Sequence, residues 1–370
     1  MDNSAAPTYA WEPGYQTVFM ASGTAALSAA VAIARSRKPE VHQPEILMPA
    51  YGCPDLVAAV LAQGSTPVLV DLEPGLPWMD HQQFRQQINN NTVAAIGVGL
   101  LGIPERLSAL SVICRDNDLL LIEDSAQCFP PVCATQPFAD CAVLSFGRGK
   151  PINLMGGGAL LVKSDLAGQP LDVVGACPSS RMNTGVLWRL KRRIVNLLLM
   201  RVPFCVLEKL PFLNIGETHF KPLDSVSRLD LPRPLLGAGI RALGRRSSIQ
   251  ALYSQQLAFA ETMGWSLLGR RAGGEAMPIL RYGLLAPTEG LRDRVARALN
   301  RRGIGASTFY RRSLPRIAGL EDVFAGVDCP RADEFAARLL TLPCHEDVTP
   351  ADIALIASIL RDQGSDPPVG

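Results

Sequence analysis

The chain is poor in histidine and has no closely spaced pair of cysteines. Its four histidines lie far apart, and its nine cysteines, an odd number between Cys53 and Cys344, include no C-x-x-C pair. Neither a metal site nor a disulfide framework is therefore expected. Unpaired cysteines in this number are typical of a reducing compartment, so the sequence predicts a cytoplasmic protein.

Long apolar runs and several familiar motifs are also missing. No stretch approaches the roughly 20 apolar residues that a membrane-spanning helix requires, and the first thirty residues lack the basic and apolar segments of a secretory signal. The glycines at 156–158 lack the lysine and serine spacing of a P-loop. Without a recognisable nucleic-acid-binding motif either, we expect no membrane span, no secretion, no ATP site and no nucleic-acid partner.

Apolar residues are plentiful, and the chain is long enough for two domains. Hydrophobic residues make up 48% of the 370 positions and charged residues 19%, which predicts a globular protein with a buried sheet. A single core usually stops growing below this length. We therefore predict a large domain over residues 1–245 and a smaller C-terminal domain over 246–370, which a helix at about 247–263 begins.

Between residues 22 and 163, apolar runs of strand length alternate with stretches of helical periodicity. This pattern is typical of a mostly parallel central sheet flanked by helices, an α/β architecture. The expected strands are Glu45–Met48, Pro67–Val70, Val93–Val98, Leu119–Ile122, Cys141–Phe146 and Gly158–Val162. The expected helices begin at Ser22-Gly23-Thr24, near Pro54–Ala62 and Pro104–Asn117, and later at Leu291–Arg301 and Thr349–Arg361.

Three clusters with chemical potential fall where strands end, which is where ligands collect in open α/β sheets. Ser22-Gly23-Thr24 opens a helix, whose free N–H groups suit a phosphate, although the same residues also make an ordinary helix cap. An apolar strand ends in Asp124, with Gln127 three residues later; this carboxylate needs a cationic partner or water, or caps the next helix. Lys150 lies in a glycine-rich loop between two strands, a setting that suits an amine nucleophile.

The order and spacing of these clusters resemble the DegT/DnrJ/EryC1/StrS sugar aminotransferase family. The resemblance covers nearly the whole chain and rests on ASGTAAL at 21–27, ILMPAYGCPDLVAAVLAQGSTPVLVD at 46–71, LIEDSAQ at 121–127, SFGRGK at 145–150, GGGALLV at 156–162 and the ending around LTLPCHEDVTPADIALI. It implies the pyridoxal 5'-phosphate (PLP)-dependent transferase fold of type I, with a large α/β domain and a smaller C-terminal α+β domain.

The resemblance also implies a role for each matching residue. Lys150 would hold the PLP cofactor as a Schiff base and later carry a proton between the donor's α-carbon and the cofactor. Asp124 would pair with the ring nitrogen, and Gln127 would lie beside the ring. The cofactor phosphate would be held by small residues, namely Gly23, Thr24 and Ser145.

The reaction implied by the resemblance is a transamination in two halves. An amino acid, typically glutamate, leaves its nitrogen on the cofactor, and a keto-sugar, nucleotide-linked in this family, then collects it in the biosynthesis of a polysaccharide or secondary metabolite. A second copy of the chain completes the site in this family. The expected partners are therefore an amino-acid donor, a keto-sugar acceptor and a homodimer mate.

Four positions depart from the family pattern. The usual Gly-Glu-Gly-Gly loop is replaced by 155–158, MGGG, so its glutamate is missing. The aromatic residue that commonly covers the ring aligns near Cys53, which leaves Tyr51 as an alternative ring contact. The asparagine of an Asn-x-Arg pattern would fall at Val226. A His-Tyr pair is replaced by 309–310, which leaves Tyr310 as a substrate contact.

Two other functions fit parts of this pattern. One is a lyase or dehydratase on the same fold, although related sugar dehydratases typically have histidine where this chain has Lys150. The other is a membrane-associated binding protein with a degenerate pocket, which the departures favour. Retention of Lys150, Asp124, Gln127 and Ser145 together opposes this second alternative.

Charge is unevenly distributed, and the basic region contains an unusual insert at about 185–215. Residues 1–150 hold 8 Lys/Arg against 14 Asp/Glu, whereas residues 181–250 hold 13 against 4. The stretch 188–213 has a basic cluster followed by broken apolar runs. One interpretation buries it at the dimer interface or under the second domain. The other is a helix at the inner face of the membrane, whose basic residues meet lipid phosphates while 194–199 enter the acyl boundary.

Overall fold

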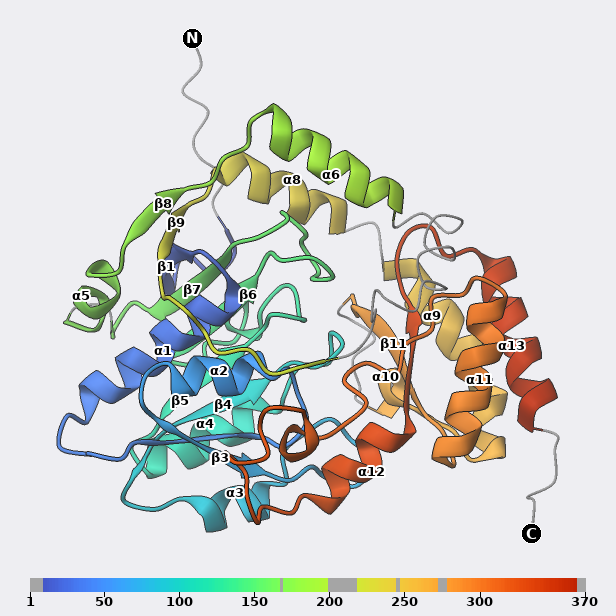
Figure 1. Ribbon diagram of the computed structural model, residues 1–370, viewed down its shortest axis with the longest axis horizontal. Helices are drawn as coiled ribbons and strands as arrows, with labels where there is room; N and C mark the ends of the chain where they lie inside the picture. Colours follow the sequence, from blue (N-terminus) through green and yellow to red (C-terminus); the bar gives the residue numbers. More distant parts are fainter. Residues whose placement is uncertain (1–8, 167–168, 199–217, 244–246, 272–277, 365–370) are drawn as a thin grey trace.

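The computed structural model describes residues 9–166, 169–198, 218–243, 247–271 and 278–364 (Figure 1). In this part of the chain the larger sheet has nine strands, in the order β3-β2-β4-β5-β6-β7-β1-β9-β8. These are β1 (Tyr15–Met20), β2 (Glu45–Pro49), β3 (Thr66–Val70), β4 (Thr92–Val98), β5 (Leu120–Asp124), β6 (Cys141–Ser145), β7 (Gly158–Lys163), β8 (Ser179–Arg181) and β9 (Arg228–Asp230).

The centre of this sheet is parallel. From β3 to β6 each strand runs parallel to its neighbours, whereas β7 runs antiparallel to both β6 and β1. All residues of β4 and β5 are buried, as expected for parallel strands that helices cover on both faces. The predicted α/β architecture with a mostly parallel sheet is confirmed.

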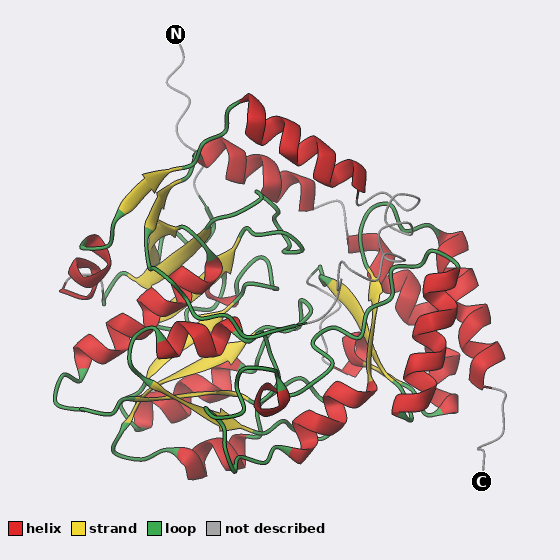
Figure 2. Cartoon of the chain, viewed as in Figure 1, coloured by secondary structure: helices red, strands yellow, loops and turns green. Residues whose placement is uncertain are grey.

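Helices cover both faces because successive side chains of each strand point to opposite sides. The helices over this part of the sheet are α1 (Gly23–Arg37), α2 (Asp55–Leu61), α3 (His81–Gln87) and α4 (Leu107–Asp116) (Figure 2). Ile122 of β5 packs in the apolar cluster of α1 and α2. The preceding Leu121 packs in the cluster of α3 and α4.

Helix α1 begins at the edge of this sheet and is held there by close backbone packing. The Ser22 hydroxyl accepts a hydrogen bond from the Ala25 amide at 3.0 Å, which caps the helix. A Cβ at Gly158 would lie 2.6 Å from the carbonyl carbon of Ser22, and a Cβ at Gly23 would lie 2.6 Å from the Cβ of Ser145. Only glycine allows the start of α1 to approach β6 and β7 this closely.

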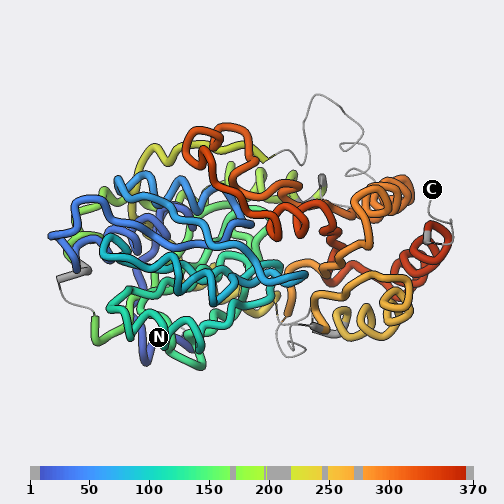
Figure 3. Tube along the Cα trace, turned by 90° about the horizontal axis from the view of Figure 1, so that it is seen from below, coloured from blue at the N-terminus to red at the C-terminus, as the bar shows by residue number. Residues whose placement is uncertain are grey.

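A smaller antiparallel sheet lies beside the large one (Figures 1 and 3). Its strands are β10 (Ser266–Leu267), β11 (Arg281–Leu285) and β12 (Leu339–Pro343), in that order. Its helices are α9 (Ser247–Gln256), α10 (Leu268–Arg271), α11 (Glu289–Arg301), α12 (Pro330–Arg338) and α13 (Pro350–Gly364). One face of this sheet forms an apolar cluster with α9, α11 and α13.

The C-terminal part of the chain is tied to the large sheet by backbone hydrogen bonds. Leu280 donates to the carbonyl of Leu101 at 2.8 Å, and Leu314 donates to that of Ala50 at 2.8 Å. The expected boundary after residue 245 falls within 244–246, outside the described residues. The division into domains of 1–245 and 246–370 therefore stays a prediction.

The remaining elements lie toward the β8 edge or in loops. They are α5 (Gln169–Gly175), α6 (Val186–Leu198), α8 (Arg233–Leu243) and the 3-10 turns Val132–Ala134, Ala258–Met263 and Leu314–Arg316. Helix α6 is the first part of the predicted insert, whose continuation over 199–217 is not among the described residues. No helix in the described ranges has the length and apolar character to cross a membrane.

Candidate active site

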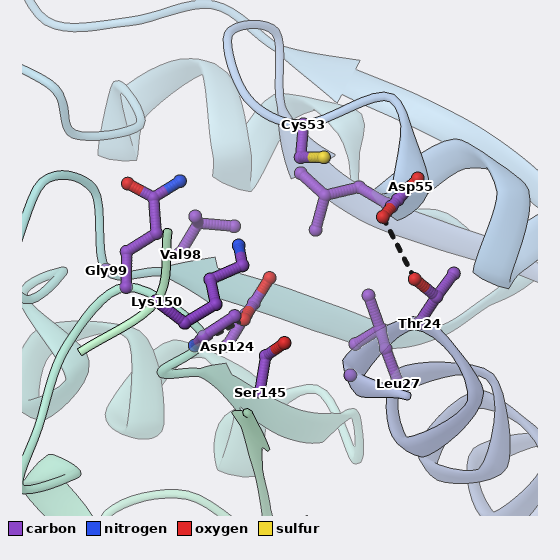
Figure 4. A pocket seen from close by; sticks show the side chains of 13 residues that line it. Thr24, Leu27, Cys53, Asp55, Val98, Gly99, Asp124, Ser145 and Lys150 are labelled. Carbon is purple, nitrogen blue, oxygen red and sulfur yellow. Dashed lines mark hydrogen bonds between the residues drawn. The ribbon is translucent and has the colours of Figure 1, made fainter. Parts of the chain in front are cut away.

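A pocket lies where the carboxyl ends of β2, β4, β5 and β6 meet. It encloses about 480 Å³ of empty space, part of which is open to solvent. Seven residues that the sequence singles out line it together: Gly23, Thr24, Cys53, Asp124, Gln127, Ser145 and Lys150 (Figure 4). Three clusters that are far apart in the sequence thus form one site, as expected for the ends of neighbouring parallel strands.

Lys150 enters this pocket from the loop between β6 and β7. Its side chain is half-buried, whereas Arg148 and Gly149 before it are exposed. Gly149 has a φ of 72°, in the left-handed region that glycine adopts readily. The chain therefore turns directly before Lys150. Figure 4 shows the Lys150 side chain next to Asp124, with Ser145 close by. An amine in this position can act as a nucleophile toward a carbonyl group inside the pocket.

Two adjacent carboxylates at the end of β5 point to opposite sides of the sheet. Asp124 lines the pocket, and its Oδ1 accepts a hydrogen bond from the Ala126 amide at 2.9 Å. Glu123 points away and accepts hydrogen bonds from the amides of Val132 at 2.6 Å and Cys133 at 3.0 Å. Alternation along the strand therefore gives Glu123 a structural setting and leaves Asp124 for a ligand.

Burial sets the electrostatics of Asp124. It raises the pKa of this carboxyl group above its usual value, while the Ala126 amide and the Lys150 ammonium act in the opposite direction. A buried carboxylate is costly unless a cation accompanies it. A protonated ring nitrogen placed against Asp124 would supply that positive charge.

The start of α1 forms a cradle with the end of β6. Gly23, Thr24 and Ser145 meet here, and the N–H groups of the first helical turn lack partners within the helix. Backbone N–H groups at a helix start, together with two hydroxyls, are a common arrangement for holding a phosphate. The absence of a side chain at Gly23 lets Ser145 approach the helix start.

A hydrogen-bonded wall closes the pocket on the side of the C-terminal segment. Gln127 accepts from the Leu101 amide at 2.9 Å and donates to the Tyr310 hydroxyl at 2.9 Å. Tyr310 also interacts with the Cys53 thiol, and burial raises the pKa of that thiol to about 11. Cys53 therefore meets a ligand as a neutral group.

Tyr51 and Tyr310 are not among the residues that line the pocket. Tyr51 is fully buried beneath it, where its ring packs edge-on against Tyr310 and Phe335 at centroid distances of 5.7 Å and 5.1 Å. A contact between Tyr51 and a ligand ring would require this packing to open. Tyr310 contacts Gln127 and Cys53, so it supports the wall from behind.

Asp55 is a pocket residue that the sequence analysis does not single out. Its carboxylate accepts a hydrogen bond from the Thr24 hydroxyl at 3.0 Å, at the first residue of α2 (Figure 4). A signal for it exists, because Asp55 follows the carboxyl end of β2 just as Asp124 ends β5. The sequence also predicts a helix start near Asp55, and an acidic residue is common at such a position without a functional role.

The Asn-x-Arg region reaches the same edge of the sheet. Arg228 begins β9, pairs with Met20 of β1, and donates through its Nε to the Cys177 carbonyl at 3.2 Å. Val226, at the position expected for the asparagine, packs against the apolar cluster of α1 and α2. The valine offers no polar group there.

These residues fit PLP in three independent respects. The Ser145 hydroxyl can join the start of α1 in a phosphate cradle because Gly23 has no Cβ to collide with it. Asp124 is a buried carboxylate suited to a pyridinium nitrogen, and Lys150 is an amine within the same pocket. When bound, PLP supplies an aldehyde that takes up an amino group and a ring that accepts an electron pair.

Known proteins with similar sequences include named aminotransferases. The chain is 25% identical over 359 residues to a dTDP-4-dehydro-2,3,6-trideoxy-D-glucose 4-aminotransferase from Saccharopolyspora spinosa, an alignment that covers 92% of this chain and 83% of the relative. It is 24% identical over 332 residues to a UDP-N-acetyl-3-dehydro-alpha-D-glucosamine 3-aminotransferase from Acidithiobacillus ferrooxidans, with 86% and 77% covered.

Solved structures show the same fold. Bacillus subtilis NtdA, solved with its cofactor PMP, matches with a TM-score of 0.71 at 17% identity over 98% of this chain and 78% of that protein. Helicobacter pylori PseC, an aminotransferase of pseudoaminic acid biosynthesis, matches with a TM-score of 0.70 at 17% identity over 94% and 86%.

The family comparison covers most of the chain. The model of the DegT/DnrJ/EryC1/StrS aminotransferase family matches residues 15–184 and 240–361, which include Lys150 and Asp124. Residues 185–239, with α6 and the rest of the insert, lie between the two matched segments. This chain belongs to the DegT/DnrJ/EryC1/StrS aminotransferase family and is a PLP-dependent aminotransferase.

Proposed function

We propose that this enzyme moves an amino group from an amino acid, glutamate in the first instance, to the keto group of a nucleotide-linked sugar. The observation that carries the proposal is the meeting of Lys150 and Asp124 in one pocket. The names of the two sequence relatives support a keto-sugar acceptor, since both act on nucleotide-linked dehydro-sugars.

Lys150 has two tasks in this proposal. Its amine would hold the cofactor through the cofactor's aldehyde group. The same amine would serve as the general base that moves a proton between the α-carbon of the donor and the C4′ atom of the cofactor. The half-buried position of Lys150 limits the access of water to its amine.

The surrounding residues bind and orient. Asp124 keeps the ring nitrogen protonated, which makes the ring a better electron acceptor. Gln127 is fixed at both ends of its amide, by Leu101 and Tyr310, so its side chain forms a rigid wall beside the ring. The phosphate is anchored by the cradle, that is, by Gly23, Thr24 and Ser145.

Exposed arginines close in sequence to Lys150 and Tyr310 support an acceptor that carries a diphosphate. Arg148 lies two residues before Lys150, and Arg311 and Arg312 directly follow Tyr310. Guanidinium groups recognise phosphates in a planar, bidentate manner. Cys53 lines the pocket and would meet the sugar, while Tyr310 supports it from behind.

The first test follows the cofactor by its visible absorbance. Wild-type enzyme with PLP is expected to be yellow and to bleach on addition of glutamate, because the amino group is transferred to the cofactor. Lys150→Ala is expected to lack the yellow absorbance. Lys163→Ala, which removes a lysine from the far end of β7 near Asp165, is the matched control and should behave as wild type.

Later steps of the same experiment identify the acceptor. Enzyme bleached by glutamate is mixed with dTDP- and UDP-linked keto-sugars, and return of the yellow colour with formation of an amino-sugar by mass spectrometry is expected. Elimination of water from the sugar instead of amination would identify a dehydratase. A wild-type protein that never becomes yellow would contradict the proposed function altogether.

We also propose that the enzyme is a homodimer and that the second copy completes the pocket. Membership of the family supports this assembly. The chain's mass of 39.8 kDa makes the test simple, since light scattering should give twice this value. A monomer that nevertheless bleaches with glutamate at the wild-type rate would contradict a shared site.

A further inference from the structure

Five apolar residues of α6 are on the outside of the molecule. In this helix Val186, Leu187, Leu190, Ile194 and Leu197 are 81%, 80%, 51%, 47% and 58% exposed. Helical spacing places them on one face. A surface helix normally turns such a face toward the core, so its exposure indicates that something covers it.

The opposite face of α6 attaches the helix to the protein. Trp188 and Val195 are half-buried, and the Trp188 ring is covered by the guanidinium group of Arg192 at 5.5 Å from the ring centroid. The helix is therefore held by this narrow side. Rotating it to bury the apolar face would expose the tryptophan, so the outward apolar face is built into the arrangement.

Basic side chains border the apolar face on both sides. By helical spacing Arg189 and Arg193 lie along one margin, and Lys191 lies along the other. All three are exposed. The helix has no acidic residue over its described length. An exposed apolar face with a cationic border is the pattern of a helix that lies in a membrane interface.

We propose that α6 docks this enzyme on an anionic lipid surface. Leu187, Leu190 and Ile194 would enter the boundary between headgroups and acyl chains, while Arg189, Lys191 and Arg193 would meet lipid phosphates. The helix lies in the plane of the surface. The inference goes beyond the aminotransferase reaction and does not depend on it.

Charge favours lipid over a second copy of the chain at this face. A two-fold symmetric contact through α6 would bring the same face of both copies together, so the basic border of one copy would lie near that of its mate. Like charges across an interface are unfavourable. An anionic lipid surface instead neutralises the cationic border and covers the apolar face at the same time.

The test is flotation of the full-length, PLP-loaded enzyme with lipid vesicles. Binding is expected with mixed phosphatidylcholine and phosphatidylglycerol vesicles at low salt, and not with phosphatidylcholine alone. The triple variant Arg189→Gln, Lys191→Gln, Arg193→Gln should lose on the order of a hundredfold in partitioning, since each basic residue near the surface contributes roughly fivefold.

The apolar arm of the test uses a matched control. Leu187→Glu with Ile194→Glu should abolish flotation, because carboxylates are repelled from the anionic surface. Val112→Glu with Val323→Glu, at sites that are 45% and 38% exposed elsewhere, adds the same charge and should leave flotation unchanged. Because these sites are exposed, all variants should keep the wild-type melting temperature and PLP absorbance.

Two results would overturn the proposal. One is failure of the wild-type enzyme to float with anionic vesicles. The other is flotation that persists in both the basic and the apolar variants. If the apolar variant instead lowers the oligomeric mass without any vesicle binding by the wild type, the face belongs to a second copy of the chain.

Discussion

At the residue scale, the site depends on glycines that let backbone segments touch. Gly158 begins β7 directly against the carbonyl group of Ser22, and this contact fixes where α1 starts. The phosphate cradle is made by that same start. A methyl group added at Gly158 would therefore disturb both the packing of the sheet and the binding of the cofactor.

Gly158→Ala is expected to lower both stability and PLP affinity. The added Cβ would lie 2.6 Å from backbone atoms of Ser22, which cannot move without displacing α1. Overpacking of this kind costs roughly 1–3 kcal/mol. Thermal unfolding and PLP titration measure the two effects.

Gly14→Ala is the matched control for this substitution. A Cβ at Gly14 meets nothing within 4 Å, so neither quantity should change. Loss of stability without loss of PLP affinity in the Gly158 variant would show that the position of α1 does not control the cradle.

At the element scale, α12 is held to the large sheet by a carboxylate from another part of the chain. Asp71, which follows β3, accepts hydrogen bonds from the amides of Arg331 at 3.0 Å and Ala332 at 2.8 Å in the first turn of α12. It thus caps a helix that lies some 260 residues later.

Asp71→Ala is expected to lower the free energy of unfolding by about 2 kcal/mol, since two helix-start amides lose a charged, buried partner. Urea unfolding measures this change. Asp116→Ala removes a carboxylate that is 63% exposed at the end of α4 and should change stability little. Equal effects in the two variants would contradict the capping role.

Much of the large sheet is predictable from the sequence because its strands are short apolar runs between helices. The expected strands from Glu45 to Val162 agree with β2 to β7 to within two residues at each end. Strands β1, β8 and β9 of the same sheet were not predicted. Their strand conformation depends on partners that are distant in the sequence, such as the pairing of Met20 with Arg228.

The site was predictable to a similar degree, and for a similar reason. Lys150, Asp124 and Gln127 stand out because they follow apolar strands, and the structure places them in one pocket. Sequence does not tell which way a side chain at a strand end turns. Tyr51 turns into the core, whereas Asp55, which does not stand out in the sequence, faces the pocket.

At the scale of the whole molecule, binding of the cofactor is expected to stabilise the folded protein. Cofactor at a hundred times its Kd adds about 2.7 kcal/mol to the free energy of unfolding. Asp124→Asn is expected to shrink this increment without destabilising the cofactor-free protein, because it removes a desolvated carboxylate and keeps an acceptor for the Ala126 amide.

Glu123→Gln should have the reverse effect, which makes the pair of variants a sharp comparison. It loses an acceptor for the amides of Val132 or Cys133, so the cofactor-free protein should be roughly 1–3 kcal/mol less stable. The PLP increment should stay as in wild type. Calorimetry with and without PLP measures both, and the same response from both variants would contradict the division of roles along β5.

The hydrogen bond between Gln127 and Tyr310 has a consequence for the order of events during synthesis. It joins residues 183 positions apart, and the hydrogen bond from the amide of Arg331 to Asp71 spans 260 positions. When β2 to β7 have emerged from the ribosome, the nascent chain already has Lys150 and Asp124. Its pocket still lacks Tyr310, which supports Gln127 from behind. PLP can therefore be held firmly only near the end of translation, after residue 310 has emerged.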